Sequence, residues 1–191
     1  EKQAANDINV WGVSMVGKVI WITGLSGAGK TTLATELVSS LRDNNDKPVL
    51  LDGDVFRDLL KLPNLMVDEH SREVRISLAL KYGLMCQLLA SQGITVVIAT
   101  ISMFEEVYTW NRKNLPNYFE VYLKVPLKEL RTRDPKSIYR QYDSGTLRNV
   151  AGLDLLVDEP SGSDLTLDFE TQPDIWESKK SLVEYLISKI K

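Results

Sequence analysis

One pattern constrains this chain more than any other. It is G-x-x-x-x-G-K-[ST], present as Gly24-Leu25-Ser26-Gly27-Ala28-Gly29-Lys30-Thr31-Thr32. An apolar, β-branched run from Lys18 to Thr23 precedes the pattern and predicts a buried strand. A helical pattern follows, with Leu33, Leu37 and Leu41 on one face. Strand, glycine-rich loop and helix is the order in which a chain wraps its backbone around phosphate groups.

The chemistry of this loop suits a nucleoside triphosphate. Its glycines let consecutive backbone N–H groups converge on phosphate oxygens, and the helix N-terminus adds a partial positive charge. Lys30 would neutralise the β- and γ-phosphates, and Thr31 would offer its hydroxyl to Mg²⁺. The alternative is a tight strand-to-helix turn without a ligand, but the complete motif in its proper context favours binding. We therefore expect a nucleoside triphosphate as a substrate and Mg²⁺ as the cofactor.

The composition of the chain limits the classes of partner that it could bind. A net charge of −3 over 191 residues argues against a general nucleic-acid or anionic membrane surface. Cys86 is the sole cysteine and lies in an apolar helical run, so we expect a small core residue and no disulfide. No segment reaches transmembrane length, which predicts a cytoplasmic protein. We expect residues 1–14 to be an upstream or expression-derived extension, and residues 15–191 to form a single domain.

Strand and helix patterns alternate along the rest of the chain. They predict an α/β fold, a parallel sheet with helices on both faces. The expected strands are 18–23, 48–51, 94–99, 118–125 and 165–167, and the expected helices are 32–41, 55–60, 68–92, 104–115, a short one opened by Pro126 at its first position, and 176–190. The long helix is expected to bury Val74, Leu78, Tyr82, Met85 and Leu89.

Two carboxylates follow the second expected strand, as Asp52-Gly53-Asp54. Ligands bind at the carboxyl ends of the strands in open parallel sheets, so Asp54 could hold Mg²⁺ or accept a proton from an attacking hydroxyl. Asp54 could instead cap the next helix. For Asp52 the functional and structural interpretations are equally open. Arg57 lies one helical turn beyond Asp54 and could face the same cleft.

A polar, basic and glycine-punctuated segment spans residues 134–152. Together with the end of the preceding helix it carries Arg131, Arg133, Lys136, Arg140 and Arg148. A run of charges is usually a solvated face. In a chain that binds phosphate, we interpret it as a mobile lid that closes over the nucleotide.

Four motifs, taken together, carry a family resemblance. They are Gly24-Leu25-Ser26-Gly27-x-Gly29-Lys30, Leu51-Asp52-Gly53-Asp54-x-x-Arg57, Arg133-Asp134-Pro135-Lys136-x-x-Tyr139 and Asn149-x-x-Gly152. In order and spacing the chain resembles adenylyl-sulfate kinases, from about Lys18 to Phe169. The resemblance implies a P-loop NTPase fold of the nucleoside-monophosphate-kinase type. It also implies that ATP phosphorylates the 3′-hydroxyl of a nucleotide that bears an activated acid group.

The resemblance also implies roles for particular residues. Asp54 matches the metal-binding or base carboxylate, with Thr31 as the other metal ligand. Arg57 and Arg75 match residues that hold the acceptor, and Ser102 matches the family's serine after the third strand. Lys136 belongs to the matching lid. Members of the family are often dimers, so a homodimer is a further expectation.

The departures from the family fall on the acceptor side. Where the family helix reads Arg-x-x-Asn-x-Arg-Arg, this chain has Leu78, Leu80 and Lys81 at the last three named positions. Val67 and Val150 stand where the family places two phenylalanines around the acceptor's adenine. Each lost stacking face would cost roughly 1–3 kcal/mol.

These losses favour a smaller pyrimidine acceptor, such as cytidine diphosphoramidate. The alternatives are adenylyl sulfate itself, or the acceptor of another small-metabolite kinase. A nucleotide-dependent switch is a rival class of protein, but the chain has no [NT]-K-x-D motif for reading guanine.

Overall fold

The computed structural model describes residues 16–43, 46–59 and 71–190. The expectations about residues 1–14 and about Val67 lie outside these residues, as does the expected start of the long helix. Of the helices in the described part of the chain, none combines the length and the apolar composition that crossing a membrane would need.

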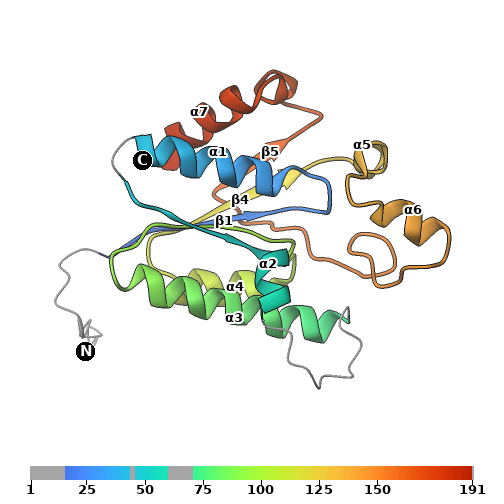
Figure 1. The fold of residues 1–191 in the computed structure, drawn as a ribbon, viewed down its shortest axis with the longest axis horizontal. Coiled ribbons are helices and arrows are strands. Elements are labelled where there is room, and N and C mark those ends of the chain that lie inside the picture. Colours follow the sequence, from blue (N-terminus) through green and yellow to red (C-terminus); the bar gives the residue numbers. More distant parts are fainter. Residues whose placement is uncertain (1–15, 44–45, 60–70, 191) are drawn as a thin grey trace.

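A parallel five-stranded sheet forms the centre of the structure (Figure 1). Its strands, in chain order, are β1 (Val19–Thr23), β2 (Val49–Asp52), β3 (Val96–Ala99), β4 (Tyr118–Lys124) and β5 (Leu165–Asp168). In space they run β2-β3-β1-β4-β5, and every neighbouring pair is parallel. The central position of β1 places the loop that follows it at the middle of the carboxyl edge of the sheet, where α/β proteins bind ligands.

Helices cover both faces of this sheet (Figure 1). On one face, α1 (Lys30–Asp43) and α7 (Lys179–Ile190) pack over Ile20 and Ile22 of β1. On the other face, α3 (Arg72–Ala90) and α4 (Glu105–Asn114) pack over Val19 and Trp21. The alternation of β1 side chains between two apolar cores is what a strand buried on both faces requires. The predicted α/β fold with helices on both faces is confirmed.

The buried face of α3 differs from the predicted one. Its buried residues are Ala79, Tyr82, Gly83, Cys86 and Ala90. Tyr82 and Cys86 are in the core as expected, whereas Met85 is 36% exposed. The helix approaches its neighbours through small residues: a Cβ on Gly83 would lie 2.6 Å from the Trp110 ring of α4. Close packing therefore sets small residues and Tyr82 against the neighbouring layers, while Val74, Leu78 and Leu89, which were expected inside, are only half-buried.

Several element boundaries also differ from the expected ones. The helix α2 (Gly53–Leu59) begins directly after β2, and Pro126 precedes the first residue of α5 (Leu127–Arg133) instead of occupying it. The expected lid segment, residues 134–152, contains a short helix, α6 (Ile138–Asp143). The last helix, α7, is preceded by a separate 3₁₀ turn, Pro173–Trp176. Such short elements depend on local contacts that hydrophobic periodicity does not reveal.

Candidate active site

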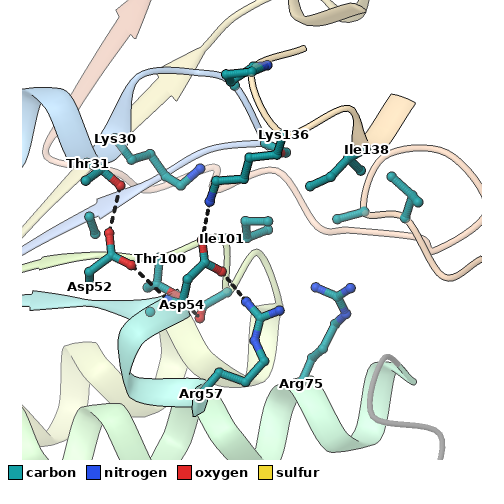
Figure 2. A pocket seen from close by; sticks show the side chains of 18 of the residues that line it. Lys30, Thr31, Asp52, Asp54, Arg57, Arg75, Thr100, Ile101, Lys136 and Ile138 are labelled. Atoms are coloured by element: carbon teal, nitrogen blue, oxygen red, sulfur yellow. Dashed lines mark hydrogen bonds and ion pairs between the residues drawn. The ribbon is translucent and has the colours of Figure 1, made fainter. Parts of the chain in front are cut away.

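A cavity of about 700 Å³ opens at the carboxyl edge of the sheet. Its walls come from the glycine-rich loop after β1, the β2–α2 junction, the end of β3, the middle of α3 and the lid segment. Figure 2 shows Lys30 and Lys136 reaching into the space above Asp54, with Lys136 paired to its carboxylate, and Arg57 and Arg75 projecting from the helices beneath. Cations and carboxylates from segments far apart in the sequence thus share one polar cavity.

The glycine-rich loop is shaped as a phosphate cradle. Gly27 and Gly29 adopt positive φ angles of 79° and 97°, which side chains with a Cβ rarely tolerate. The carbonyl oxygen of Ser26 accepts a hydrogen bond of 2.8 Å from the Tyr139 hydroxyl, a buried group of the lid segment. This bond turns one carbonyl oxygen of the loop toward the protein, which suits a loop whose N–H groups must face an anion.

Lys30 is a desolvated cation at the base of the cavity. Its Nζ donates a 2.8 Å hydrogen bond to the carbonyl oxygen of Leu25. Burial lowers the pKa of Lys30 to about 8, because the loss of hydration outweighs the attraction of Asp54. A cation held with so little water gains much from an incoming phosphate, which restores the solvation that burial removed.

This pKa predicts how ATP capture depends on pH. We expect kcat/KM for ATP, measured at a low and fixed acceptor concentration, to fall as pH rises through about 8, because the free enzyme then loses the proton of Lys30. Burial raises the pKa of Tyr82, Cys86 and Tyr139 to about 12, so these groups titrate above the pH range of this measurement. A profile that stays flat to about pH 9.5 would show that the charge of Lys30 in the free enzyme does not limit capture.

Asp52 joins the glycine-rich loop to β2 and α2. Its Oδ2 accepts a 2.7 Å hydrogen bond from the Thr31 hydroxyl, and its Oδ1 accepts one of 2.9 Å from the backbone N–H of Asp54. The second contact caps α2, the structural role that the sequence left open for Asp54. The first contact places a carboxylate oxygen beside the hydroxyl expected to bind metal. Asp52, whose role the sequence left open, therefore belongs to the candidate site.

Asp54 sits at the centre of a cluster of cations. Its two carboxylate oxygens pair with Arg57 of α2 and with Lys136 of the lid segment (Figure 2). Partial burial acts to raise the pKa of Asp54, but the hydrogen bond and charge of Lys136, with the charges of Arg57 and Lys30, hold it below its ordinary value. Asp54 is therefore ionised at neutral pH and can accept a hydrogen bond or a proton, or coordinate a cation.

The far side of the cavity is formed by α3, the end of β3 and the end of the lid segment. Arg75 donates a 3.0 Å hydrogen bond to the carbonyl oxygen of Asn149, and Val150 beside it is 5% exposed. The buried Ser102 hydroxyl lies 2.7 Å from that of Thr100, with a positive φ of 30° at Ser102. No aromatic side chain stands at position 150.

The structure brings most of the predicted site residues together. Those that line the cavity are Ser26, Gly27, Gly29, Lys30, Thr31, Thr32, Asp54, Arg57, Arg75, Ser102 and Lys136. Gly24 and Ala28 do not line it: Gly24 packs against Leu123 of β4, and Ala28 is fully buried. Both residues therefore support the loop from the side that faces the protein core.

Other lining residues were not among the site residues predicted from the sequence. Thr100 and Ile101 line the cavity just past β3, as do Arg133, directly before the lid segment, and Arg148 within it. The sequence could have indicated Thr100 and Ile101, because they follow a predicted strand and the carboxyl ends of parallel strands meet at one edge of the sheet. The two arginines had been grouped with the lid charges, and only the fold distinguishes them from solvated cations.

Comparison with known proteins agrees with this geometry. The family model for adenylylsulphate kinase matches residues 16–168. The cytidine diphosphoramidate kinase of Campylobacter jejuni is 36% identical over 172 residues, covering 90% of this chain and 95% of the relative. A probable adenylyl-sulfate kinase of Pyrococcus abyssi is 36% identical over 154 residues, covering 81% and 86%. The adenylyl-sulfate kinase of Pseudomonas aeruginosa is 34% identical over 171 residues, covering 88% and 84%.

A solved structure provides the matching comparison in three dimensions. The APS kinase of Mycobacterium tuberculosis, in complex with AMPPNP and APS, superposes with a TM-score of 0.81 at 28% identity, over 92% of this chain and 98% of that one. The sheet, the glycine-rich loop and the family model therefore all lead to one assignment. The chain belongs to the adenylyl-sulfate kinase family of ATP-dependent phosphotransferases.

Proposed function

We propose that this protein transfers the γ-phosphoryl group of ATP to the 3′-hydroxyl of a nucleotide linked to a small acid group, with cytidine diphosphoramidate as the better candidate acceptor. The observation that carries the proposal is the contrast between the two sides of the cavity. The phosphate side has Lys30, Thr31 and Asp54, whereas the acceptor side has Val150 at the position where the family resemblance implies an aromatic ring.

The phosphate side supports an in-line transfer. The backbone N–H groups of the glycine-rich loop and the Lys30 ammonium would hold the β- and γ-phosphates and neutralise the charge that develops between them. The acceptor hydroxyl would attack from the α3 side, where Asp54 orients it or takes its proton. Closure of the lid segment would bring Lys136 over the phosphates and exclude water as a competing acceptor.

The residues present suit Mg²⁺. Thr31 Oγ1 and Asp52 Oδ2 lie 2.7 Å apart, so two hard oxygen donors are available at one point of the cavity. Among the described residues, no group of three or more His, Cys, Asp or Glu side chains could hold a metal ion as a closed protein cage. This is typical of Mg²⁺, which is held by few protein ligands together with water and substrate phosphates, and which would neutralise phosphate charge when bound. Asp54, expected to be a ligand with Thr31, lies next to Asp52 and remains a candidate.

The acceptor side supports a pyrimidine. Val150 presents a small aliphatic surface within a buried wall, where an adenine ring would lose roughly 1–3 kcal/mol of stacking. A cytosine ring is smaller and needs less stacking surface. The Campylobacter jejuni relative named as a cytidine diphosphoramidate kinase supports this acceptor, while adenylyl-sulfate kinases of similar identity and coverage keep adenylyl sulfate as the alternative.

The test is a comparison of acceptors, together with a substitution at position 150. In an ADP-release assay with ATP and Mg²⁺, we expect the wild type to prefer cytidine diphosphoramidate to adenylyl sulfate. The Val150→Phe variant should shift that preference toward adenylyl sulfate by about tenfold, because the new ring offers adenine a stacking face and crowds the pocket. The ratio of the two kcat/KM values is the measurement.

Val16→Phe provides the matched control. Val16 is 51% exposed, precedes β1 at the far edge of the sheet and does not line the cavity. It should leave the acceptor ratio unchanged. Efficient turnover of adenylyl sulfate by the wild type, with none of the cytidine compound, would assign the protein to adenylyl-sulfate phosphorylation and refute the role given to Val150. Turnover of neither compound would direct the search to other nucleotide-linked acceptors.

A further inference from the structure

A compact turn follows the lid helix and forms part of the acceptor wall. We name residues 149–155 the acceptor turn. Its backbone folds on itself: the carbonyl oxygen of Val150 accepts hydrogen bonds from Leu153 and Leu155, at 3.0 and 3.2 Å, and the N–H of Gly152 donates to Leu155 at 3.0 Å. Asn149 and Gly152 adopt positive φ angles of 56° and 82°. Glycine adopts such an angle without steric cost, whereas Asn149 carries a Cβ and needs contacts that hold it in place.

One carboxylate supplies those contacts from within the turn. Asp154 Oδ2 accepts a 2.9 Å hydrogen bond from the backbone N–H of Asn149, and Asp154 Oδ1 accepts one of 2.7 Å from that of Val150. Each oxygen thus holds one backbone amide. Desolvation acts to raise the pKa of Asp154, but these two amides hold it below its ordinary value, so the carboxylate is charged at neutral pH. Hydrogen bonds to an ionised acceptor are among the stronger ones.

The acceptor turn also connects both sides of the cavity. From α3, Arg75 donates a 3.0 Å hydrogen bond to the carbonyl oxygen of Asn149. From the glycine-rich loop, the Leu25 side chain packs on Gly152, where a Cβ would come within 2.9 Å of it. Val150 lies between these two contacts, in the cavity wall. The conformation of the turn therefore sets where Arg75 and Val150 meet an acceptor.

We propose that Asp154 is a positioning residue for the acceptor: by holding the amides of Asn149 and Val150, it fixes the wall against which the acceptor nucleotide binds. Asp154 is itself exposed and does not line the cavity, so it acts through the turn and not by touching substrate. The inference rests on the proposed function, since it assigns the acceptor to this side of the cavity.

The substitution Asp154→Asn tests the proposal with little change in shape. A carboxamide has one acceptor oxygen, so its NH₂ group would face one of the two backbone amides, and one hydrogen bond would become a donor–donor contact. We expect KM for the acceptor to rise about tenfold while KM for ATP changes less than about twofold. Hydrogen exchange of the amides of Asn149 and Val150 should accelerate in the same variant.

Asp168→Asn is the matched control. The Asp168 carboxylate also accepts hydrogen bonds from two backbone amides, those of Glu170 and Thr171 at 2.9 and 3.3 Å, but both bonds end on Oδ1, in the loop after β5 and outside this cavity. Asp168→Asn therefore controls for the loss of a carboxylate charge, since its one carboxamide oxygen can keep both bonds. We expect it to leave KM for the acceptor and the exchange of residues 149 and 150 unchanged.

The outcomes separate this inference from the proposed function. Faster exchange at 149 and 150 with an unchanged acceptor KM would overturn the positioning role, and so would equal rises in KM for ATP and acceptor. Unchanged exchange in Asp154→Asn would overturn the role even if the wild type turned over neither acceptor. The absence of turnover in the wild type would count against the proposed acceptors alone.

Discussion

Replacing Asp54 by alanine is expected to lower kcat by about 10³-fold, with KM for ATP much less affected. The carboxylate is ionised and lies where the glycine-rich loop, α2 and the lid segment meet. Its removal leaves Lys30, Arg57 and Lys136 without the anion between them, and leaves the attacking hydroxyl without a group to orient it or accept its proton. Steady-state ADP release with saturating ATP and acceptor is the measurement.

The control for Asp54 lies on the same helix. Asp58 of α2 is exposed and does not line the cavity, so Asp58→Ala should retain near-normal kcat. Asp54→Asn keeps the shape of the side chain, and we expect it to lose as much activity as the alanine variant, because an amide cannot take the proton. Near-normal turnover in Asp54→Ala with an unchanged melting temperature would remove this carboxylate from the mechanism.

Replacing Lys30 by alanine is expected to lower kcat by about 10²- to 10³-fold and to raise KM for ATP by about tenfold. Lys30 is the desolvated cation at the base of the cavity, so its charge acts on phosphate in a medium of low polarity. Because charge builds up on the transferring group in the transition state, kcat should suffer more than ground-state binding. Kinetics at varied ATP separate the two effects.

The fold should survive the loss of Lys30. Its pKa is about 8 in the folded protein against 10.5 for a free lysine, so the unfolded chain binds the proton more tightly. Native stability therefore rises between about pH 8 and 10.5, and the buried charge is a cost below that range. Lys30→Ala should not lower the melting temperature at pH 7. Lys113→Ala, on the exposed face of α4, should change neither kinetics nor stability. Unfolding of Lys30→Ala under the assay conditions would contradict this account.

Much of the phosphate side could be predicted from the sequence, because its residues are neighbours along the chain. The segment from β1 through the glycine-rich loop to α1 is local, and the same strand-loop-helix order produced the expected geometry. Asp54 and Arg57 were also predictable, since they lie at the end of a strand and one helical turn beyond it. Alternating strand and helix patterns predicted the parallel sheet for a similar reason: each pattern reports the burial of its own segment.

Contacts between segments that are distant in the sequence were harder to predict. Hydrophobic periodicity placed Met85 of α3 inside, yet the face that this helix buries consists of Tyr82 and small residues, and Met85 is exposed. Asp52 was undecided until the structure placed its carboxylate on the Thr31 hydroxyl. The role of Asp154 was not expected, because both amides that it holds belong to a turn without a periodic pattern.

The sequence by itself therefore determined the fold class and the phosphate-binding loop, since these depend on local backbone geometry and on residue types at short spacing. The chemical class of the reaction followed from the family resemblance that four motifs carry. Only the tertiary structure decided which charged side chains from distant segments come into contact in the cavity. Asp54 and Lys136 are separated by 82 positions and form one ion pair, and Arg75 reaches Asn149 across 74. Charge interactions depend on distance in space, and the packing of the whole chain sets that distance.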